Sequence, residues 1–290
     1  MTRPIQYSIF SILLGASLLL EWRSVLATWE LATQNEEYTH ILLIVPVVLA
    51  LFFLDWRSIK LAFPAGTKLG SAILLLALLI AEASRRNYLI LMPDVYLALG
   101  MFALLTWWIG SFIFCFGAKA AWKEIFPLGF LYWLVPWPQA ILAVVVPWLQ
   151  QESASSARTL FALSGTPVVL DGISLILPGL TLNVAPECSS IRSSLLLLLT
   201  SMIFAHLFLR SFWRKLAVVA AAIVLSPLKN GLRIFVIGFL TLRVDPSYLQ
   251  GELHRNGGVV FLAIAQGIVI ALLWILRRGE QHANPVQTST

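Results

Sequence analysis

The chain has 290 residues, of which 59% are hydrophobic and 12% are charged, and its mean hydropathy is +0.86. A soluble domain of this length does not need so much apolar sequence, so the composition indicates a polytopic membrane protein. The net charge of +6 lies in short loops, where it favours a role in membrane topology over nucleic-acid binding, and two cysteines exclude a disulfide-dense secreted scaffold.

Apolar runs predict about eight transmembrane helices, because a span needs about 20 mostly apolar residues. The fifth run carries Pro127, Pro136, Pro138 and Pro147, so we expect a kink or a break there. The seventh is expected to be interrupted at residues 226–230, which include a proline, a lysine and an asparagine. The predicted helices lie near residues 7–28, 38–54, 69–84, 95–116, 125–148, 189–209, 213–240 and 258–276.

The placement of basic residues assigns the two sides of the membrane. With both termini in the cytoplasm, the short inner loops are the basic ones, as the positive-inside rule requires. We expect a multi-pass protein of the inner (plasma) membrane, with one membrane domain over residues 1–280 and a polar tail over 281–290. The extracytoplasmic segments are then those around residues 30–37, 82–94, 153–187 and 228–255.

The longest polar stretch, residues 149–187, is predicted to form an extracytoplasmic insertion. Its first part, Gln150–Arg158, indicates an interfacial helix. Two short apolar runs on either side of Asp171-Gly172 predict a β-hairpin, which either binds an extended peptide by strand addition or caps the bundle. The expected fold class is therefore all-α integral membrane, with a small extracytoplasmic hairpin and an interfacial helix.

Cys188 directly follows this insertion and precedes an apolar run. Pro186 suits the first turn of a helix, where unpaired N–H groups and the helix dipole favour an anion. Arg192 follows four residues later on the same helical face, so the thiolate form is favoured and Cys188 is a candidate nucleophile. Inert packing remains the alternative for Cys188, and it is the expected role of Cys115.

Two further polar clusters are predicted on the same side of the membrane. In the first, Arg233 is the stronger candidate for a site residue, because the Lys229 side chain can extend to the interface. In the second, His254 precedes the last span and is the natural acid–base group. His40, with Tyr38 at the outer end of the second helix, is either a further member of the site or an interfacial anchor.

Cysteine, histidine and arginine are together suited to acyl transfer. A thiolate attacks an amide carbonyl to form a thioester, a histidine protonates the leaving amine, and an arginine stabilises the oxyanion. No zinc, Walker or Rossmann pattern is present in the sequence, so we expect neither a metal nor another cofactor. The competing interpretation is a non-enzymatic transporter or an assembly factor for exported polysaccharide.

The order of these motifs resembles the exosortase/archaeosortase family over roughly residues 30–277. Many members have glycine after the Cys-Ser pair, where this chain has Ser190. The elements that carry the resemblance are Cys188-Ser189-x-x-Arg192, Asn230-x-x-Arg233, His254, Glu37–His40, Pro136–Pro138, Gln150–Ser156 and the glycine-containing hairpin.

The resemblance implies an integral-membrane cysteine transpeptidase. Cys188 takes the position of the nucleophile, Arg233 that of the stabilising arginine and His254 that of the acid–base histidine. Arg192 and Asn230 are supporting residues by the same motifs, and the sequence leaves open whether Arg192 or Arg233 stabilises the oxyanion. The implied partners are membrane lipid, an acceptor that the sequence does not identify, and exported proteins with a C-terminal sorting tail made of a short motif, a transmembrane helix and a basic end.

Overall fold

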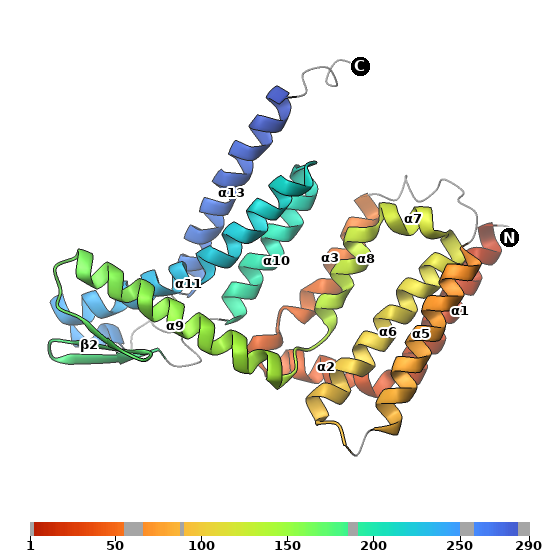
Figure 1. Ribbon diagram of the computed structural model, residues 1–290, viewed down its shortest axis with the longest axis horizontal. Coiled ribbons are helices and arrows are strands. Elements are labelled where there is room, and N and C mark those ends of the chain that lie inside the picture. The colour runs from red at the N-terminus through yellow and green to blue at the C-terminus, as the bar shows by residue number, and fades with distance from the viewer. Residues whose placement is uncertain (1–2, 55–65, 88–89, 185–190, 250–257, 284–290) are drawn as a thin grey trace. The chain divides into compact units, whose positions relative to one another are not determined.

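The computed structural model describes residues 3–54, 66–87, 90–184, 191–249 and 258–283. The chain divides into two compact units, Met1–Leu142 and Ala143–Thr290, which we describe separately. Most described residues are helical and only one small sheet is present among them, so the expected all-α membrane fold is confirmed (Figure 1). The single membrane domain expected over residues 1–280 stays a prediction.

The number of apolar helices agrees with the predicted number of spans. Six described helices are long and apolar enough to cross a membrane, and the number is eight if each of two bent helix pairs forms one span. The six are residues Glu36–Leu54, Thr67–Arg86, Pro93–Phe116, Ile191–Phe208, Phe212–Arg243 and Gly258–Gln281.

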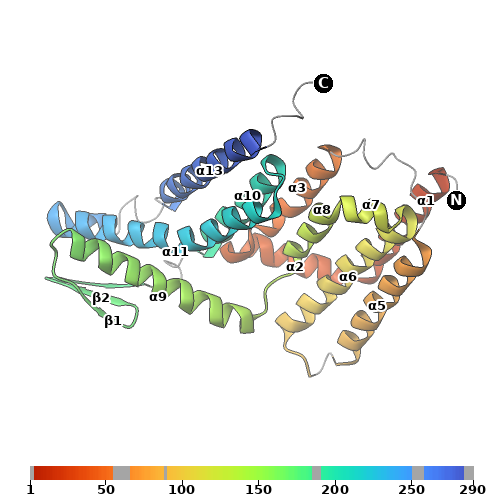
Figure 2. The same cartoon turned by 45° about the horizontal axis from the view of Figure 1, so that its top comes forward.

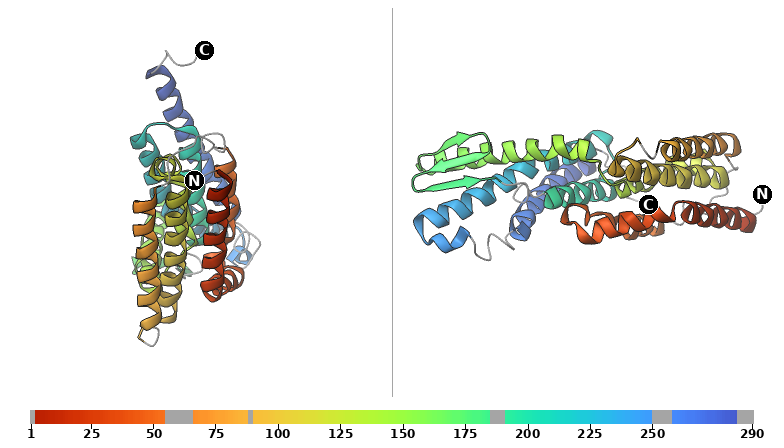
Figure 3. Two further views of the ribbon diagram at one scale, coloured as in Figure 1. Left: turned by 90° about the vertical axis from the view of Figure 1, so that its right-hand side faces the viewer. Right: turned by 90° about the horizontal axis from the view of Figure 1, so that it is seen from below.

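In the first unit, every element within the described residues is a helix. Helices α5 and α6 lie side by side, as both views in Figure 3 show, and their backbones approach closely at glycines. A Cβ atom added at Gly70 would lie 2.5 Å from the backbone nitrogen of Phe114. The elements are α1 Arg3–Leu20, α2 Trp22–Gln34, η1 Glu36–Tyr38, α3 Ile41–Leu54, α5 Thr67–Arg86, α6 Pro93–Phe116, α7 Ala118–Lys123, α8 Ile125–Phe130 and η2 Leu131–Leu134.

The first predicted span, residues 7–28, is wrong as a single straight helix. The chain bends by 73° between α1 and α2, at Glu21. The Glu21 carboxylate accepts a hydrogen bond from Ser24 at 3.1 Å and pairs with Arg85 of α5 at 2.6 Å. The acidic side chain is therefore bound at the start of α2 and to a neighbouring helix, a tertiary contact that apolar run length does not reveal.

The core of the first unit is apolar and aromatic. Phe10, Phe52, Phe112 and Phe116 form a chain of ring contacts with centroids 5.0 to 6.1 Å apart. Cys115 lies in the same helix as two of these rings and is 0% exposed, which confirms its expected burial.

The second unit combines helices with a three-stranded sheet. Helix α9 runs alongside α11, and the sheet lies at the end of α9 (Figure 2). The elements are α9 Gln139–Leu163, β1 Val169–Asp171, β2 Ser174–Leu177, β3 Leu180–Asn183, α10 Ile191–Phe208, α11 Phe212–Arg243, η4 Pro246–Leu249 and α13 Gly258–Ala283.

Two predicted boundaries in this part of the chain differ from the structure. The expected break in the fifth run is confirmed at residues 135–138, between η2 and α9. Residues 150–158 are helical as predicted, but they continue α9 from Gln139 without interruption, so the expected boundary near residue 148 is wrong. Their interfacial position stays a prediction. The expected interruption of the seventh helix is also wrong, since α11 passes through Pro227. Neighbouring helices make an interior proline tolerable in such spans.

The predicted hairpin is confirmed and is extended by a strand that the sequence did not predict. The antiparallel sheet has the order β1-β2-β3, with Gly172 (φ 59°) and Gly179 (φ 78°) in its two turns. Only glycine adopts such angles without strain. One face of the sheet packs on Phe161 of α9 and Phe235 of α11 through Leu170, Leu175, Leu177, Leu180 and Leu182.

Candidate active site

Two of the predicted site residues, Cys188 and His254, lie outside the described residues. The chain on their borders is described: Val184 precedes the Cys188 segment, Ile191 follows it, and Gly258 follows the His254 segment. The surroundings of these three points therefore define the candidate site.

The chain enters the Cys188 segment from a firmly held point. The Val184 N–H donates to the Ile173 carbonyl at 3.1 Å, which continues the pairing of β2 with β3. The Val184 carbonyl accepts a hydrogen bond of 2.7 Å from Gln150 Nε2 of α9. Val184 is 1% exposed, so both the sheet and α9 hold the chain four residues before Cys188.

The chain leaves the Cys188 segment beside a buried lysine. Lys229 Nζ of α11 donates to Ser193 Oγ, in the first turn of α10, at 2.5 Å. Lys229 is only 6% exposed, so the expectation that its amine extends to the interface is wrong. This contact could not be predicted from the sequence, because Ser193 is 36 residues away. A lysine within an otherwise apolar helix was the available sequence signal.

Asn230 joins α11 to α9. Its Nδ2 donates to Ser153 Oγ at 3.1 Å, and Asn230 is 2% exposed. Its Oδ1 has no hydrogen-bond partner within the described residues. The next residue, Gly231, permits this contact, because a Cβ there would lie 2.9 Å from the Ser153 carbonyl oxygen and 2.5 Å from the Ser156 Cβ.

Arg233 reaches the border of the His254 segment. It lies one helical turn beyond Lys229 on α11 and is half-buried. A Cβ on Gly258, the first residue of α13, would lie 3.9 Å from Arg233 Nη1. Since Gly258 follows His254 by four residues, the Cα atoms of these two residues are at most about 14 Å apart. Arg192, in contrast, is exposed at the start of α10.

Ser153, Ser193, Lys229, Asn230 and Arg233 will be called the Lys229 cluster. A single stretch of α11 thus contacts α9, the start of α10 and the start of α13. The cluster is rich in positive charge and hydroxyl groups, which suits stabilisation of an anion. Within the described part of the chain, no group of three His, Cys, Asp or Glu side chains is arranged to hold a metal ion.

Tyr38 and His40 belong to the first unit. The Tyr38 hydroxyl donates to the Trp137 carbonyl at 2.9 Å, which ties two elements of the resemblance together. His40 Nδ1 lies 3.1 Å from the Glu37 carbonyl oxygen, and His40 is 3% exposed. Its Nε2 has no partner in the described ranges. Whether His40 belongs to the site or is an anchor stays open, since the two units are described separately.

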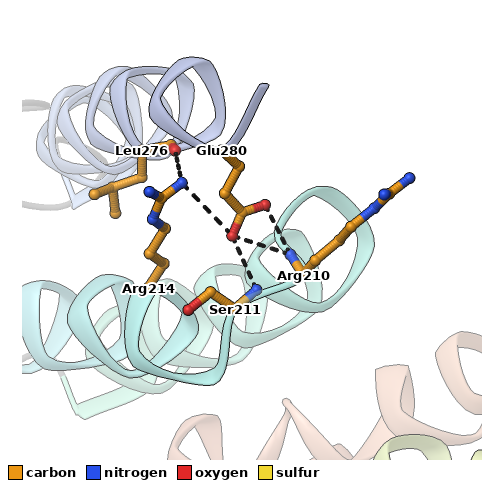
Figure 4. A network of polar contacts seen from close by, with 5 residues as sticks. All are labelled: Arg210, Ser211, Arg214, Leu276 and Glu280. Carbon is orange, nitrogen blue, oxygen red and sulfur yellow. Dashed lines mark hydrogen bonds and ion pairs between the residues drawn. The ribbon is translucent and has the colours of Figure 1, made fainter. Parts of the chain in front are cut away.

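A second polar cluster lies at the start of α11, whereas the Lys229 cluster lies just past the middle of this helix (Figure 4). The Glu280 carboxylate accepts hydrogen bonds from the backbone N–H groups of Arg210 at 3.0 Å and Ser211 at 2.9 Å. Arg214 Nη1 donates to the Leu276 carbonyl at 2.9 Å and lies 3.8 Å from Glu280 Oε1. These five residues, the Glu280 cluster, join α13 to the first turn of α11.

Comparison with known proteins assigns the family. The family model for the transmembrane exosortase (Exosortase_EpsH) matches residues 22–274. This range includes the Lys229 cluster, Cys188 and His254. No curated protein and no solved structure matches the chain. Because the model covers most of the sequence, the chain belongs to the transmembrane exosortase family.

Proposed function

We propose that this protein is a membrane cysteine protease and transpeptidase that cleaves the C-terminal sorting signal of exported proteins and transfers them to an acceptor. The observation that carries the proposal is the convergence at the Lys229 cluster. Lys229 bonds to Ser193 just after the Cys188 segment, and Arg233 approaches Gly258 just after the His254 segment. Asn230 bonds to Ser153 of α9, the helix whose Gln150 holds Val184 just before the Cys188 segment. Family membership supports the same chemistry.

In the first half-reaction, the Cys188 thiolate attacks the carbonyl carbon of the scissile amide, and the carbonyl electrons move to oxygen. The Arg233 guanidinium stabilises that oxyanion. When the intermediate collapses, the C–N bond breaks, the amine takes a proton from His254, and a thioester remains on Cys188.

In the second half-reaction, the acceptor nucleophile gives its proton to His254 and attacks the thioester carbonyl. The C–S bond breaks, the Cys188 thiolate is restored, and the exported protein is bound to the acceptor. Lys229 and Asn230 act at a distance in this scheme, because their hydrogen bonds hold α10 and α9 against α11. Their role is to position the groups that react.

The decisive test is the dependence of processing on Cys188. Cys188→Ala should abolish cleavage of a native substrate, while Cys115→Ala, at a buried thiol far along the chain, should leave it intact. Under acceptor-limited conditions, mass spectrometry should detect a thioester on Cys188 in the parent and much less in His254→Ala. Normal processing by Cys188→Ala would exclude the mechanism and favour a non-enzymatic assembly role.

The proposal also assigns the site to the extracytoplasmic face of the plasma membrane, which follows from the positive-inside rule. A membrane-impermeant maleimide should label Cys188 in intact cells. Reporter proteins fused within residues 150–180 should behave as extracytoplasmic. Cytoplasmic behaviour of those fusions would reverse the topology and separate the site from exported substrates.

A further inference from the structure

The outer edge of β3 presents unused backbone groups. Because the Val184 N–H bonds to β2, the alternation of an antiparallel ladder directs Leu182 and Leu180 toward β2 as well. The N–H and C=O groups of Thr181 and Asn183 therefore point away from the sheet. Among the described residues, no backbone hydrogen bond reaches this edge. Both side chains are exposed.

The two edges of the sheet differ in their protection. Natural edge strands are commonly blocked by proline or by a charged side chain, which prevents another chain from pairing. A proline precedes each edge strand by two residues, Pro167 before β1 and Pro178 before β3, so the difference lies in charge. Strand β1 ends in Asp171, whereas β3 reads Leu-Thr-Leu-Asn and has no charged residue. The unprotected edge is thus the one that continues toward Cys188.

Strand β3 is also held rigidly. Its Leu180 and Leu182 side chains pack with the core formed by α9, α11 and the sheet. Leu182 lies so close to α11 that a Cβ on Gly238 would be 2.6 Å from its Cδ1. A rigid edge strand pairs with an extended peptide at a lower entropic cost than a flexible one.

Chain connectivity places this edge near the proposed nucleophile. Cys188 follows Val184 by four residues, so their Cα atoms are separated by at most about 14 Å. A strand added beside β3 would lie about 4.8 Å from it. An extended peptide of a few residues on this edge therefore has the length to reach Cys188.

We propose that the outer edge of β3 binds the substrate by strand addition. The occupant is the short extended motif of the sorting tail, ahead of the tail's transmembrane helix, and the inference rests on the proposed function. Backbone hydrogen bonds to Thr181 and Asn183 would supply affinity, and side chains that alternate on the two sides of the added strand would supply specificity.

A pair of variants isolates the backbone contribution at this edge. Thr181→Pro removes one outward N–H, and proline is tolerated where the N–H of an edge strand faces away from the sheet. Thr181→Val is the matched variant, because it also removes the hydroxyl but keeps the N–H. The measured quantity is the ratio of their rates of processing for a native exported protein whose cleavage depends on Cys188. We expect Thr181→Pro to be about tenfold slower, the scale of one lost hydrogen bond.

Two controls establish that both variants are folded and identify the occupant. The fraction of Cys188 that is labelled by maleimide should be equal in the two variants. In a Cys188→Ala background, p-benzoylphenylalanine in place of Thr181 should cross-link to the tail of that exported protein. The same photoreactive residue in place of Val169, which is 62% exposed on β1, should not.

The outcomes separate the two proposals. Equal rates for Thr181→Pro and Thr181→Val, or cross-links from position 181 only to a second copy of this chain, would overturn strand addition while Cys188-dependent processing upheld the function. If maleimide labelling differs between the two variants, their rates are not comparable, and the cross-link from position 181 alone tests strand addition. Processing that does not depend on Cys188 would overturn both proposals.

Discussion

The two polar clusters on α11, one at its start and one just past its middle, use similar residues in different ways. They are roughly 25 Å apart along the helix axis. In the Glu280 cluster, a carboxylate neutralises Arg214 and accepts hydrogen bonds from two backbone N–H groups. In the Lys229 cluster, the buried lysine bonds to a hydroxyl, and Asn230 Oδ1 has no partner in the described residues.

This difference separates an anchor from a site. Charges within membrane helices are costly, and where they serve the fold they are usually neutralised and fully hydrogen-bonded. The Glu280 cluster meets that standard and joins α13 to α11. In the Lys229 cluster, by contrast, the buried Lys229 amine bonds to a neutral hydroxyl, and the Asn230 Oδ1 acceptor has no partner within the described residues, as is expected where polar groups in a membrane helix serve a reaction.

The largest expected difference between the clusters is in the rate of substrate processing after one arginine is removed from each. Arg233→Ala should lower the rate of substrate processing at least about 100-fold, the scale for loss of one oxyanion donor. Arg233→Lys should restore little, because lysine lacks the planar fork of a guanidinium. Arg214→Ala should keep the rate and lower the thermal midpoint. The rates are measured in membranes at equal amounts of folded protein. If Arg214→Ala lost activity and Arg233→Ala did not, the Glu280 cluster would be the site and the Lys229 cluster the structural anchor.

Crowding a glycine should test the packing beneath the Lys229 cluster. Gly231→Ala forces a Cβ to within 2.5 Å of the Ser156 Cβ on α9, so the free energy of unfolding should fall by about 1–3 kcal/mol. Gly267→Ala, in α13, has no atom within 4 Å of the added methyl and should be neutral or slightly stabilising. Thermal denaturation in detergent measures both. A stable Gly231→Ala protein would show that α9 and α11 are less closely packed.

Replacing the buried lysine should separate stability from activity. Lys229→Met should slow processing about tenfold, because one charge-assisted hydrogen bond to the start of α10 is lost. Its thermal midpoint should not fall, since apolar replacement of a buried charge is often neutral or stabilising. Lys215→Met, in the first turns of α11, is the matched control and should keep the parent rate. A lower thermal midpoint for Lys229→Met without loss of rate would make Lys229 a structural residue.

The smallest effect is expected at the anchor. Glu280→Ala removes the acceptor for the N–H groups of Arg210 and Ser211, so stability should fall by about 1 kcal/mol. Processing per folded molecule should be unchanged, because Glu280 is remote from the site along α11. Denaturant titration and the processing assay provide the two values. A rate loss equal to that of Lys229→Met would mean that the clusters do not have separate roles.

The predicted elements agreed best with the structure where run length alone decides the outcome. The spans near 95–116, 189–209 and 258–276 match α6, α10 and α13 closely, because 20 apolar residues have few alternatives in a membrane. Errors occurred at Glu21 and Pro227, where local sequence preferences (apolar run length and helix breaking by proline) compete with contacts made by neighbouring helices. The helix predicted over residues 7–28 bends at Glu21, which pairs with Arg85, and Pro227 does not break the helix that contains it.

Local turn chemistry was equally informative for the sheet. Asp171-Gly172 marked the first turn correctly, because only glycine adopts a positive φ without strain. The turn at Pro178-Gly179 and strand β3 were missed, although the same rule applies there. The apolar runs are too short for periodicity to distinguish a strand from a loop.

The sequence by itself determined the membrane class, the order of the motifs and the candidates Cys188, Arg233 and His254. These depend only on composition and on residues that are close together in the chain. The tertiary structure decided what surrounds α11. The Lys229–Ser193 bond, the Asn230–Ser153 bond and the approach of Arg233 to Gly258 join segments 25 to 77 residues apart. Such contacts depend on how helices pack, and packing is set by side chains of several helices at once.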